Sequence, residues 1–598
     1  MKILRRQLQL TYHFLKQSHH SFRDVLVVHG LMLFIVIPGL TATVKFLLAS
    51  GDITYLALDQ FFWLLTHHPF VVASLIGVGI LILLAVFFEF TFLLFSMYFI
   101  QKKQRIRLTQ LLRLSIQQMK KIRVSVLIFF LLYFVLLLPI GTFNFRSDLL
   151  AKIQIPAFIM DYIFANRVSV IASFVVGYLV LLYLGIRFLF VLPELIFNNK
   201  KVGEAIEISW TLTKKRLFFI FFTFLGITLS ILAINALAFI LLIFIQNLFD
   251  SYLPKYALIA AVFIMFFMQA ALLLNVVLTT ISSFYFIIFI LDQEQRLPEQ
   301  LIPLPSHIAA TFSTWQMIGL ALVGSLFGVS VGLYNYDYLN HAQLSVPLTI
   351  SHRGVSNGNG IQNTLTSLAK TSTTYHPNYV EMDVQETSDH HFIVYHDFSY
   401  RNLAKTSLVP EENTLEQALS LQLKENGQVG NIASFDAYLK EAKRLNQKLL
   451  IEIKTQQKDK KGLAERFLAK YKTEIDDQHH LVQSLNYQIV ETIKTQAPEI
   501  TVGYILPFNL VGPPKTQADF LVMEMTTLTS QFVTSAHQDD KKVFVWTPND
   551  IGQMERMMFY GVDGIITDRM DLLNEAKKIE TTEESYADKL AYFVVGIG

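Results

Sequence analysis

Long apolar runs dominate the chain up to about residue 334, and polar positions interrupt them only briefly. Seven of these runs approach or exceed the ~20 residues that a helix needs to cross a bilayer. They are 25–48, 71–100, 124–143, 168–190, 217–245, 258–291 and 317–334. The first run is longer than the ~7–15 apolar residues of a signal peptide, so we expect it to be retained. The pattern predicts an α-helical polytopic membrane domain over residues 1–340, with about seven helices.

The pattern changes beyond residue 346, where short β-branched and aromatic runs alternate with helical stretches. Eight of these runs predict strands. They are 348–353, 379–384, 449–454, 481–484, 501–506, 520–525, 543–547 and 564–567. Strands that alternate with helices predict an α/β TIM barrel, (β/α)8, over residues 346–578. Residues 579–598 predict a tail that is disordered or weakly helical.

Composition agrees with this division into a membrane part and a soluble part. Of the 598 residues, 53% are hydrophobic and only 16% are charged, whereas soluble proteins contain ~25% charged residues. The apolar excess lies in the first half of the chain. There is no cysteine, which excludes a disulfide framework and a zinc site with cysteine ligands.

Lysine and arginine lie mainly in alternate loops between the apolar runs, and this asymmetry sets the orientation of membrane helices. The rich side carries Lys2, Arg5, Arg6, Lys16, Arg23, Lys102, Lys103, Arg105, Arg107, Arg113, Lys120, Lys121, Arg123, Lys200, Lys201, Lys214, Lys215 and Arg216, and the poor side Arg146, Lys152, Arg167 and Lys255. We therefore expect a multi-pass protein of the cell membrane with a cytoplasmic N-terminus. An odd number of spans places the barrel in the extracellular space, and one miscounted helix would reverse this.

Charges inside the apolar runs are rare, and a buried charge needs a partner. Glu89 and Arg187 lie within two such runs, so we expect them to form an ion pair, which either fixes helix packing or marks a path for lipid. Two loops, 105–122 and 202–213, mix apolar and polar residues. They are either helices on the anionic face of the membrane or solvated elbows between spans.

Polar side chains gather where strands of the second half end. They are His352 and Arg353 in ISHRG, Glu381 and Asp383 in YVEMDVQ, and His396 and Asp397 in FIVYHD. Strand alternation puts Glu381 and Asp383 on one face. Two adjacent carboxylates repel unless a cation lies between them, so the pair predicts a site for a hard metal ion. The two flanking histidines predict a general base and a general acid.

Five short motifs occur in order: HRG at 352–354, QNT at 362–364, ExD at 381–383, HD at 396–397 and LLIEIK at 449–454. Together they resemble the glycerophosphodiester phosphodiesterase family over roughly residues 346–574. The apolar half is similar to the multi-helix membrane region fused to such enzymes in Gram-positive bacteria. The resemblance implies a TIM barrel, a divalent metal, and cleavage of glycerol-phosphate diesters to glycerol phosphate and an alcohol. It also implies that residues 399–446 are the family's insertion over the site, with residues 392–396 as an additional strand.

The resemblance, carried over residue by residue, implies that Glu381, Asp383 and Glu452 bind the metal. Three carboxylates without a thiol suit Mg²⁺ or Ca²⁺. His352 and His396 are then the catalytic acid–base pair. One activates the glycerol 2-hydroxyl or a water, and the other protonates the departing alkoxide; which histidine does which stays open.

The same resemblance implies four substrate-binding residues: Arg353, Asn363, Lys454 and Trp546. Arg353 and Lys454 would bind the non-bridging phosphate oxygens. Asn363 either contacts the substrate or orients a metal ligand. Trp546, in a motif that resembles the family's WTxN, either gives the glycerol an apolar wall or belongs to the barrel core.

One position departs from the family pattern. The family commonly has Glu before the asparagine, whereas this chain has Gln362 before Asn363, which removes a negative charge from the edge of the site. The segment GVDGIITD at 561–568 is similar to the family's GxDGIxTD, and we expect its Asp568 to be structural.

The favoured interpretation is an envelope enzyme whose substrate is lipoteichoic acid, a phospholipid headgroup or a deacylated glycerophosphodiester. Its partners are then this diester or glycerol-phosphate polymer and membrane lipids, with no nucleic acid. Two alternatives stay open: a transporter or lipid-handling protein whose barrel is a non-catalytic sensor, and a phosphodiesterase of the phospholipase C or D type. The sequence does not define the oligomeric state.

Overall fold

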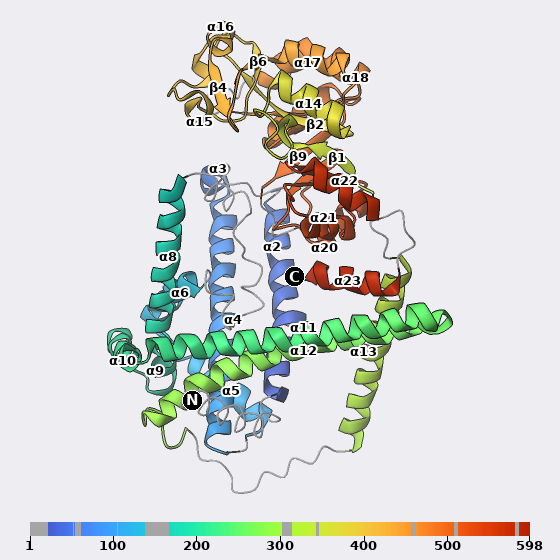
Figure 1. The fold of residues 1–598 in the computed structure, drawn as a ribbon. Helices are drawn as coiled ribbons and strands as arrows, with labels where there is room; N and C mark the ends of the chain where they lie inside the picture. The colour runs from blue at the N-terminus through green and yellow to red at the C-terminus, as the bar shows by residue number, and fades with distance from the viewer. Residues whose placement is uncertain are drawn as a thin grey trace. The chain divides into compact units, whose positions relative to one another are not determined.

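The structure, a computed structural model, describes residues 22–51, 53, 61–104, 106–137, 167–301, 314–341, 346–455, 462–507, 512–579 and 585–597. These residues form two compact units, which meet in the chain between Asn340 and His341. The first unit is helical and the second contains the sheet (Figure 1). The basic start of the chain at 1–21, the loop charges Arg105, Arg146 and Lys152, and residues 342–345 lie outside the described residues.

The helical unit is built from elements whose bounds follow the apolar runs. In its described part they are η1 (Met32–Val36), α2 (Ile37–Ser50), α3 (Phe61–His67), α4 (Pro69–Gln101), α5 (Leu108–Met119), α6 (Val124–Leu137), α8 (Arg167–Arg187), α9 (Val191–Phe197), α10 (Val202–Lys214), α11 (Leu217–Tyr252), α12 (Pro254–Gln293) and α13 (Thr314–His341).

Among the residues of this unit that the structure describes, five stretches are long and apolar enough to cross a membrane. They are Phe22–Ser50, Pro69–Gln101, Val175–Phe197, Leu217–Tyr252 and Pro254–Gln293, and each coincides with a predicted span. The predicted span 124–143 corresponds to α6, whose description ends at residue 137, and the span 317–334 lies within α13. The polytopic membrane domain is therefore confirmed, while the count of seven stays a prediction.

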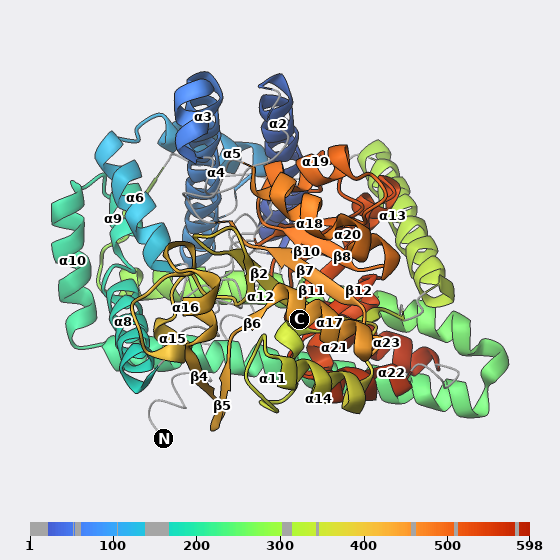
Figure 2. The same ribbon diagram turned by 90° about the horizontal axis from the view of Figure 1, so that it is seen from above.

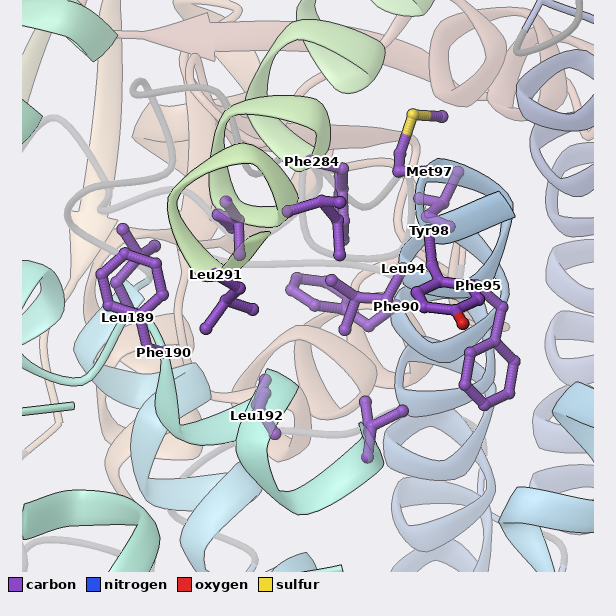
Figure 3. Close-up of a cluster of buried hydrophobic side chains, with 14 of the residues drawn as sticks. Phe90, Leu94, Phe95, Met97, Tyr98, Leu189, Phe190, Leu192, Phe284 and Leu291 are labelled. Atoms are coloured by element: carbon purple, nitrogen blue, oxygen red, sulfur yellow. The ribbon is translucent and has the colours of Figure 1, made fainter. Parts of the chain in front are cut away.

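Aromatic packing holds the helical unit together at the C-terminal half of α4. Figure 3 shows side chains of α4, of the 189–192 segment and of α12 pointing toward one another. Phe90 of α4 meets Phe284 of α12 edge to face, with ring centroids 5.3 Å apart, the geometry that ring quadrupoles favour. In lipid, helices associate through such close packing because apolar surface gains little by leaving an apolar solvent.

Arg187, at the end of α8, is buried by contacts with α10. Its Nη1 donates to the carbonyl of Trp210 (3.0 Å) and to Thr213 Oγ1 (2.9 Å). The guanidinium lies 4.1 Å from the Trp210 ring centroid, which is a favourable cation–π arrangement. The predicted ion pair of Arg187 with Glu89 is therefore wrong: the guanidinium contacts a carbonyl, a hydroxyl and a ring, and its Nε has no hydrogen-bond partner among the described residues.

The second unit is the predicted TIM barrel. Its eight parallel strands are β1 (Leu348–Ser351), β2 (Tyr379–Glu386), β7 (Leu449–Ile453), β8 (Leu481–Ser484), β9 (Val502–Leu506), β10 (Phe520–Glu524), β11 (Lys542–Trp546) and β12 (Gly564–Thr567). The order β1-β12-β11-β10-β9-β8-β7-β2 closes through the pairing of β1 with β2. Figure 2 shows the strands surrounded by their helices. All eight predicted strands are confirmed within one or two residues at each end.

Helices cover the outside of the barrel. They are α14 (Leu365–Tyr375), α17 (Phe435–Arg444), α18 (Leu463–Asp477), α19 (Tyr487–Gln496), α20 (Ser530–Gln538), α21 (Ile551–Phe559) and α22 (Met570–Ile579). The described part of the β9–β10 connection contains no helix. Several of these helices begin at a side-chain cap: Thr364, for example, accepts a hydrogen bond from the backbone N–H of Ser367, which satisfies an otherwise unpaired donor.

An insertion follows β2, and it is shorter than predicted. It starts with β3 (Phe392–Val394), antiparallel to β2, and continues through α15 (Arg401–Ala404), η5 (Pro410–Glu412), α16 (Leu415–Leu419) and the hairpin of β4 (Gln422–Glu425) and β5 (Gln428–Asn431) to β6 (Ala433–Ser434). The predicted end at residue 446 is wrong, because α17 is a barrel helix. Its apolar face of Phe435, Tyr438, Leu439 and Ala442 is buried.

The C-terminal tail is also more ordered than predicted. Residues 586–597 form α23 (Tyr586–Ile597), which packs against α21. Ala587, Leu590 and Phe593 recur every three residues, so they share one helix face, and all three are buried. The apolar face of α23 is buried because α21 of the barrel packs against it.

The barrel interior is closely packed with side chains below the strand ends. The rings of Phe520 in β10 and Phe544 in β11 contact each other at a tilt, with centroids 4.5 Å apart, and Gly503 of β9 leaves the room that the Phe520 ring occupies. A Cβ on Gly503 would lie 2.1 Å from that ring. Glycine at this position is thus a requirement of core packing.

We predict that Gly503→Ala lowers the free energy of unfolding of the barrel by about 1–3 kcal/mol, since an added methyl overpacks a filled core. Gly552→Ala, a matched change within α21 whose new Cβ meets only a carboxylate oxygen at 3.5 Å, should be neutral or slightly stabilising. Denaturant unfolding of the two variants tests this. Equal stability of both variants would contradict the packing account.

Candidate functional site

Three acidic side chains meet at the C-terminal ends of β2 and β7. Asp383 and Glu452 are register partners on the two neighbouring strands, and Glu381 lies two residues before Asp383, on the same face. All three are buried, and their nearest carboxylate oxygens lie within 4.8 Å of one another. Burial, together with the charges of the other two carboxylates, raises the pKa of Glu381 well above its ordinary value.

This acidic trio fits a divalent cation. Burial raises the pKa of Asp383, but Lys454, His396 and Arg353 outweigh this effect and hold it well below its ordinary range, so Asp383 is charged. Its Oδ1 accepts no hydrogen bond from the described residues, and the nearby Lys454 Nζ is 3.2 Å away. Buried oxygens without donors and a set of hard carboxylate ligands suit Mg²⁺ or Ca²⁺.

His352 follows β1, and the residue that orients it lies 216 positions later in the sequence. Its Nδ1 lies 2.8 Å from Asp568 Oδ1, just after β12. Asn549 Nδ2 donates to the other Asp568 oxygen (2.9 Å), and Asn549 Oδ1 accepts from the Asp568 N–H. Burial raises the pKa of Asp568, but the charge and hydrogen bond of His352 and the amide of Asn549 hold it at about 2.

His396 follows β3 and has an equivalent partner next to it in the chain. Its Nδ1 lies 2.8 Å from Asp397 Oδ1, and Asn402 Nδ2 donates to Asp397 Oδ2. The buried Gln385 donates to the carbonyls of Tyr395 and Asp397, which flank the histidine. Burial lowers the pKa of His396 to about 4, and the cationic groups of Lys454 and Arg353 act in the same direction.

Arg353 and Asn363 lie against the acidic trio. The backbone N–H of Arg353 donates to Glu381 Oε2 (2.9 Å), and its Nη1 donates to Gln362 Oε1 (2.7 Å). The buried Nε has no hydrogen-bond partner among the described residues. Asn363 Nδ2 donates to Asp383 Oδ2 (2.8 Å), and its Oδ1 accepts from the Asp383 N–H (3.2 Å). Of the two predictions for Asn363, this placement favours the orientation of a carboxylate.

Lys454 and Trp546 complete the predicted set. Lys454 Nζ donates to Glu452 Oε1 (2.9 Å) and thereby bridges Glu452 and Asp383. Burial lowers the pKa of Lys454, but the two carboxylates outweigh this and raise it, so it is charged. Trp546 ends β11 half-buried, and it packs on the apolar cluster inside the barrel.

The structure thus brings together residues from β1, β2, β3, β7, β11 and β12 that the sequence scattered over about 200 positions. Sequence reasoning missed the partners of the two histidines. Asp568 was expected to be structural, and Asp397 was noted without a role. The sequence did mark both residues, because Asp397 ends the motif FIVYHD and Asp568 ends the motif GVDGIITD. It did not show that each one contacts a histidine, since the folded barrel makes these pairs.

Two family models match the chain. The model of the membrane domain of glycerophosphoryl diester phosphodiesterase matches residues 8–331, more than half of the chain. The model of the glycerophosphoryl diester phosphodiesterase family matches residues 352–572.

Two relatives and one solved structure each match about two fifths of the chain. A glycerophosphodiester phosphodiesterase of Caldanaerobacter subterraneus is 27% identical over 240 residues, 39% of this chain and 98% of the relative. A Bacillus subtilis protein assigned by name to the same activity is 27% identical over 250 residues, with the same two coverages. The crystal structure of a glycerophosphodiester phosphodiesterase from Parabacteroides distasonis has 26% identity and a TM-score of 0.34, covering 40% of this chain and 97% of that one.

The lowered pKa of His396 predicts a pH-dependent loss of stability. Between pH 6.5 and about 4 the unfolded chain binds a proton at this position and the folded chain does not, so the free energy of unfolding should fall as the pH falls through this window. His396→Gln, which can still donate to Asp397, should lose less. Denaturant unfolding at several pH values, in the presence of a chelator, measures the difference.

The exposed His479→Gln serves as the control and should follow the parent protein across the same pH range. If the free energy of unfolding varied with pH in the same way for the parent and His396→Gln, His396 would have the same pKa in the folded and the unfolded chain, which would contradict the prediction.

Proposed function

Because the chain belongs to the glycerophosphoryl diester phosphodiesterase family, as a member that carries the family's membrane domain, we propose that its barrel hydrolyses glycerol-phosphate diesters to glycerol 3-phosphate and an alcohol. The observation that carries the proposal is the convergence, at one end of the barrel, of three buried carboxylates, two histidines and two cationic side chains. In metal-assisted hydrolysis of a phosphodiester, carboxylates can hold the metal, histidines can transfer protons and cationic side chains can bind the phosphate oxygens.

Glu381, Asp383 and Glu452 would hold one divalent cation, Mg²⁺ or Ca²⁺. When bound, the cation neutralises negative charge on phosphate oxygens. Asn363 keeps Asp383 in place through two hydrogen bonds, as partners of metal ligands commonly do. The chain's own cations, Arg353 and Lys454, would then bind the non-bridging oxygens.

His352 and His396 are our candidates for proton transfer. Each has a carboxylate at Nδ1, Asp568 and Asp397 respectively. This contact orients the ring and leaves Nε2 free to exchange a proton with a ligand. One histidine would take the proton of the attacking water or glycerol hydroxyl, and the other would give a proton to the leaving alkoxide.

Arg353 is suited to the phosphate for a structural reason. Its buried Nε has no hydrogen-bond partner among the described residues, and an unpaired buried donor costs free energy unless a ligand accepts from it. A phosphate oxygen is such an acceptor, and the planar guanidinium offers it two parallel donors.

The membrane domain makes this a membrane protein. We propose that it lies in the cell membrane with the N-terminus in the cytoplasm and the barrel outside. The positive charge of alternate loops supports this orientation. A barrel tethered to the outer face would meet lipoteichoic acid, phospholipid headgroups or deacylated glycerophosphodiesters, all of which contain the glycerol-phosphate diester.

The full-length protein, in detergent with Mg²⁺ or Ca²⁺, should release glycerol 3-phosphate from a simple glycerophosphodiester. His352→Ala, His396→Ala and Glu381→Ala should each lower kcat by about 10²-fold or more, since each removes a proton-transfer group or a charge at the metal site. A chelator should abolish release, and added cation should restore it. The measurement is the amount of glycerol 3-phosphate released, first from the simple diester and then from lipoteichoic acid as a second substrate.

His479→Ala and Glu499→Ala are matched controls, because both residues are exposed and precede their strands at the other end of the barrel. They should keep the parent activity.

A cyclic phosphate as the product would instead support the phospholipase type of reaction. No release from any diester by the folded, metal-supplied protein would overturn the proposed function.

The absence of cysteine makes the orientation directly testable. A single Thr495→Cys on the exposed surface of the barrel domain should react with a membrane-impermeant maleimide in intact cells. Gln117→Cys, exposed on α5 in a basic loop, should react only after permeabilisation. The reverse labelling pattern would place the barrel in the cytoplasm.

A further inference from the structure

Gln362, the position that departs from the family pattern, lies between two charged side chains. On one side its Oε1 accepts from Arg353 Nη1 (2.7 Å). On the other side its Nε2 donates to Glu425 Oε1 (2.6 Å), and its backbone N–H donates to Glu425 Oε2 (2.8 Å). Both oxygens of Glu425 are therefore used by a single residue of the site.

Glu425 comes from the insertion, at the end of β4 in the β4–β5 hairpin. The hairpin is fastened to the loop before Gln362 by further bonds. Asn426 Nδ2 donates to the carbonyl of Gly360 (2.9 Å), and Gln428 Nε2 donates to the carbonyl of Asn359 (3.0 Å). Figure 2 shows the hairpin next to α15 and α16, two helices of the insertion. The hairpin thus reaches the site through one carboxylate.

The chemistry of these bonds explains why residue 362 is an amide. A glutamine can accept from Arg353 and donate to Glu425 at the same time, whereas an ionised glutamate has no donor. A glutamate at 362 would place two carboxylates in contact, and these repel. The negative charge missing from residue 362 is therefore present on Glu425, one residue further from Arg353.

Arg353 depends on this chain of contacts for its orientation. Its backbone is in the left-handed region (φ 52°), and its N–H is held by Glu381. The guanidinium is held at Nη1 by Gln362, while Nε lies 3.8 Å from Asp383 Oδ2 without a hydrogen bond. A guanidinium fixed at one corner directs its remaining donors to one place, which lowers the entropy cost of binding an anion.

We propose that Glu425 is a positioning residue for the phosphate site, which acts through Gln362 to fix the Arg353 guanidinium, so that the insertion hairpin is part of the substrate-binding machinery. This proposal rests on the proposed function, because it takes the phosphate of a glycerophosphodiester as the ligand of Arg353. The test is a charge swap between residues 362 and 425.

Three variants of the full-length protein make up the swap: Gln362→Glu, Glu425→Gln, and both changes together. Gln362→Glu leaves two carboxylates in contact, and Glu425→Gln turns one acceptor into a donor that faces a donor. The double variant restores all three bonds, and only the bond between the side chains of residues 362 and 425 changes direction. Its residue 425 donates to the carboxylate at 362 and accepts from the backbone N–H, while the carboxylate accepts from Arg353.

We expect each single change to raise KM for a glycerophosphodiester by about tenfold, the loss of roughly one hydrogen bond, with kcat changed by less than about threefold. The double variant should return to within about threefold of the parent KM. Lys424→Gln, a charge change on the neighbouring exposed position of β4, should leave KM unchanged. Thermal unfolding of every variant is measured alongside.

Two results would overturn the proposal: single variants with the parent KM, or a double variant whose KM is the product of the two single effects. A fall in unfolding temperature that parallels the KM changes would assign Glu425 a merely structural role and also overturn it. Calorimetry can also measure the Kd of glycerol 3-phosphate for the parent and the three variants, so that the same comparison is made without turnover. A parent that binds this product but hydrolyses no diester would refute the proposed function and leave the swap test intact.

Discussion

The mutual repulsion of Glu381, Asp383 and Glu452 is the constraint on which the site depends. Two neighbouring parallel strands bring three buried carboxylates within 4.8 Å of one another, an arrangement that is unfavourable by itself. The surrounding residues compensate for it in different ways. Lys454 bridges two of the carboxylates, Arg353 brings a backbone donor and a charge, and burial with its neighbours' charges raises the pKa of Glu381. A divalent cation would complete this compensation.

The same repulsion accounts for how charge is distributed further out. The cations Arg353 and Lys454 lie next to the trio. Further out, Asp568 and Asp397 contact the two histidines, and Glu425 contacts Gln362, which contacts Arg353. Each outer carboxylate holds a residue of the inner ring: His352, His396 or, through Gln362, Arg353. The outer carboxylates therefore orient the side chains that lie between them and the acidic trio.

The sequence predicted what depends on local pattern. The eight strands, the apolar spans and the acidic residues on one strand face all follow from alternation and run length, which neighbouring residues determine. It did not predict what depends on closure of the fold. Asp568 lies 216 residues from His352, the α17 face gained a partner only in the barrel, and Arg187 found the Trp210 ring where a carboxylate was expected. Glu425 carries no sequence signal, because an acidic residue in a hairpin is usually solvated.

Closure of the barrel also determines when the site can come into existence. β1 pairs with β12, and His352 receives its carboxylate from the residue that follows β12. A ribosome delivers these two strands at opposite ends of the domain, and such non-local pairing forms late. A nascent chain that stops before Asp568 lacks both the closed barrel and the oriented imidazole. The candidate site therefore becomes complete only when the last strand of the barrel has been synthesised and has paired with the first.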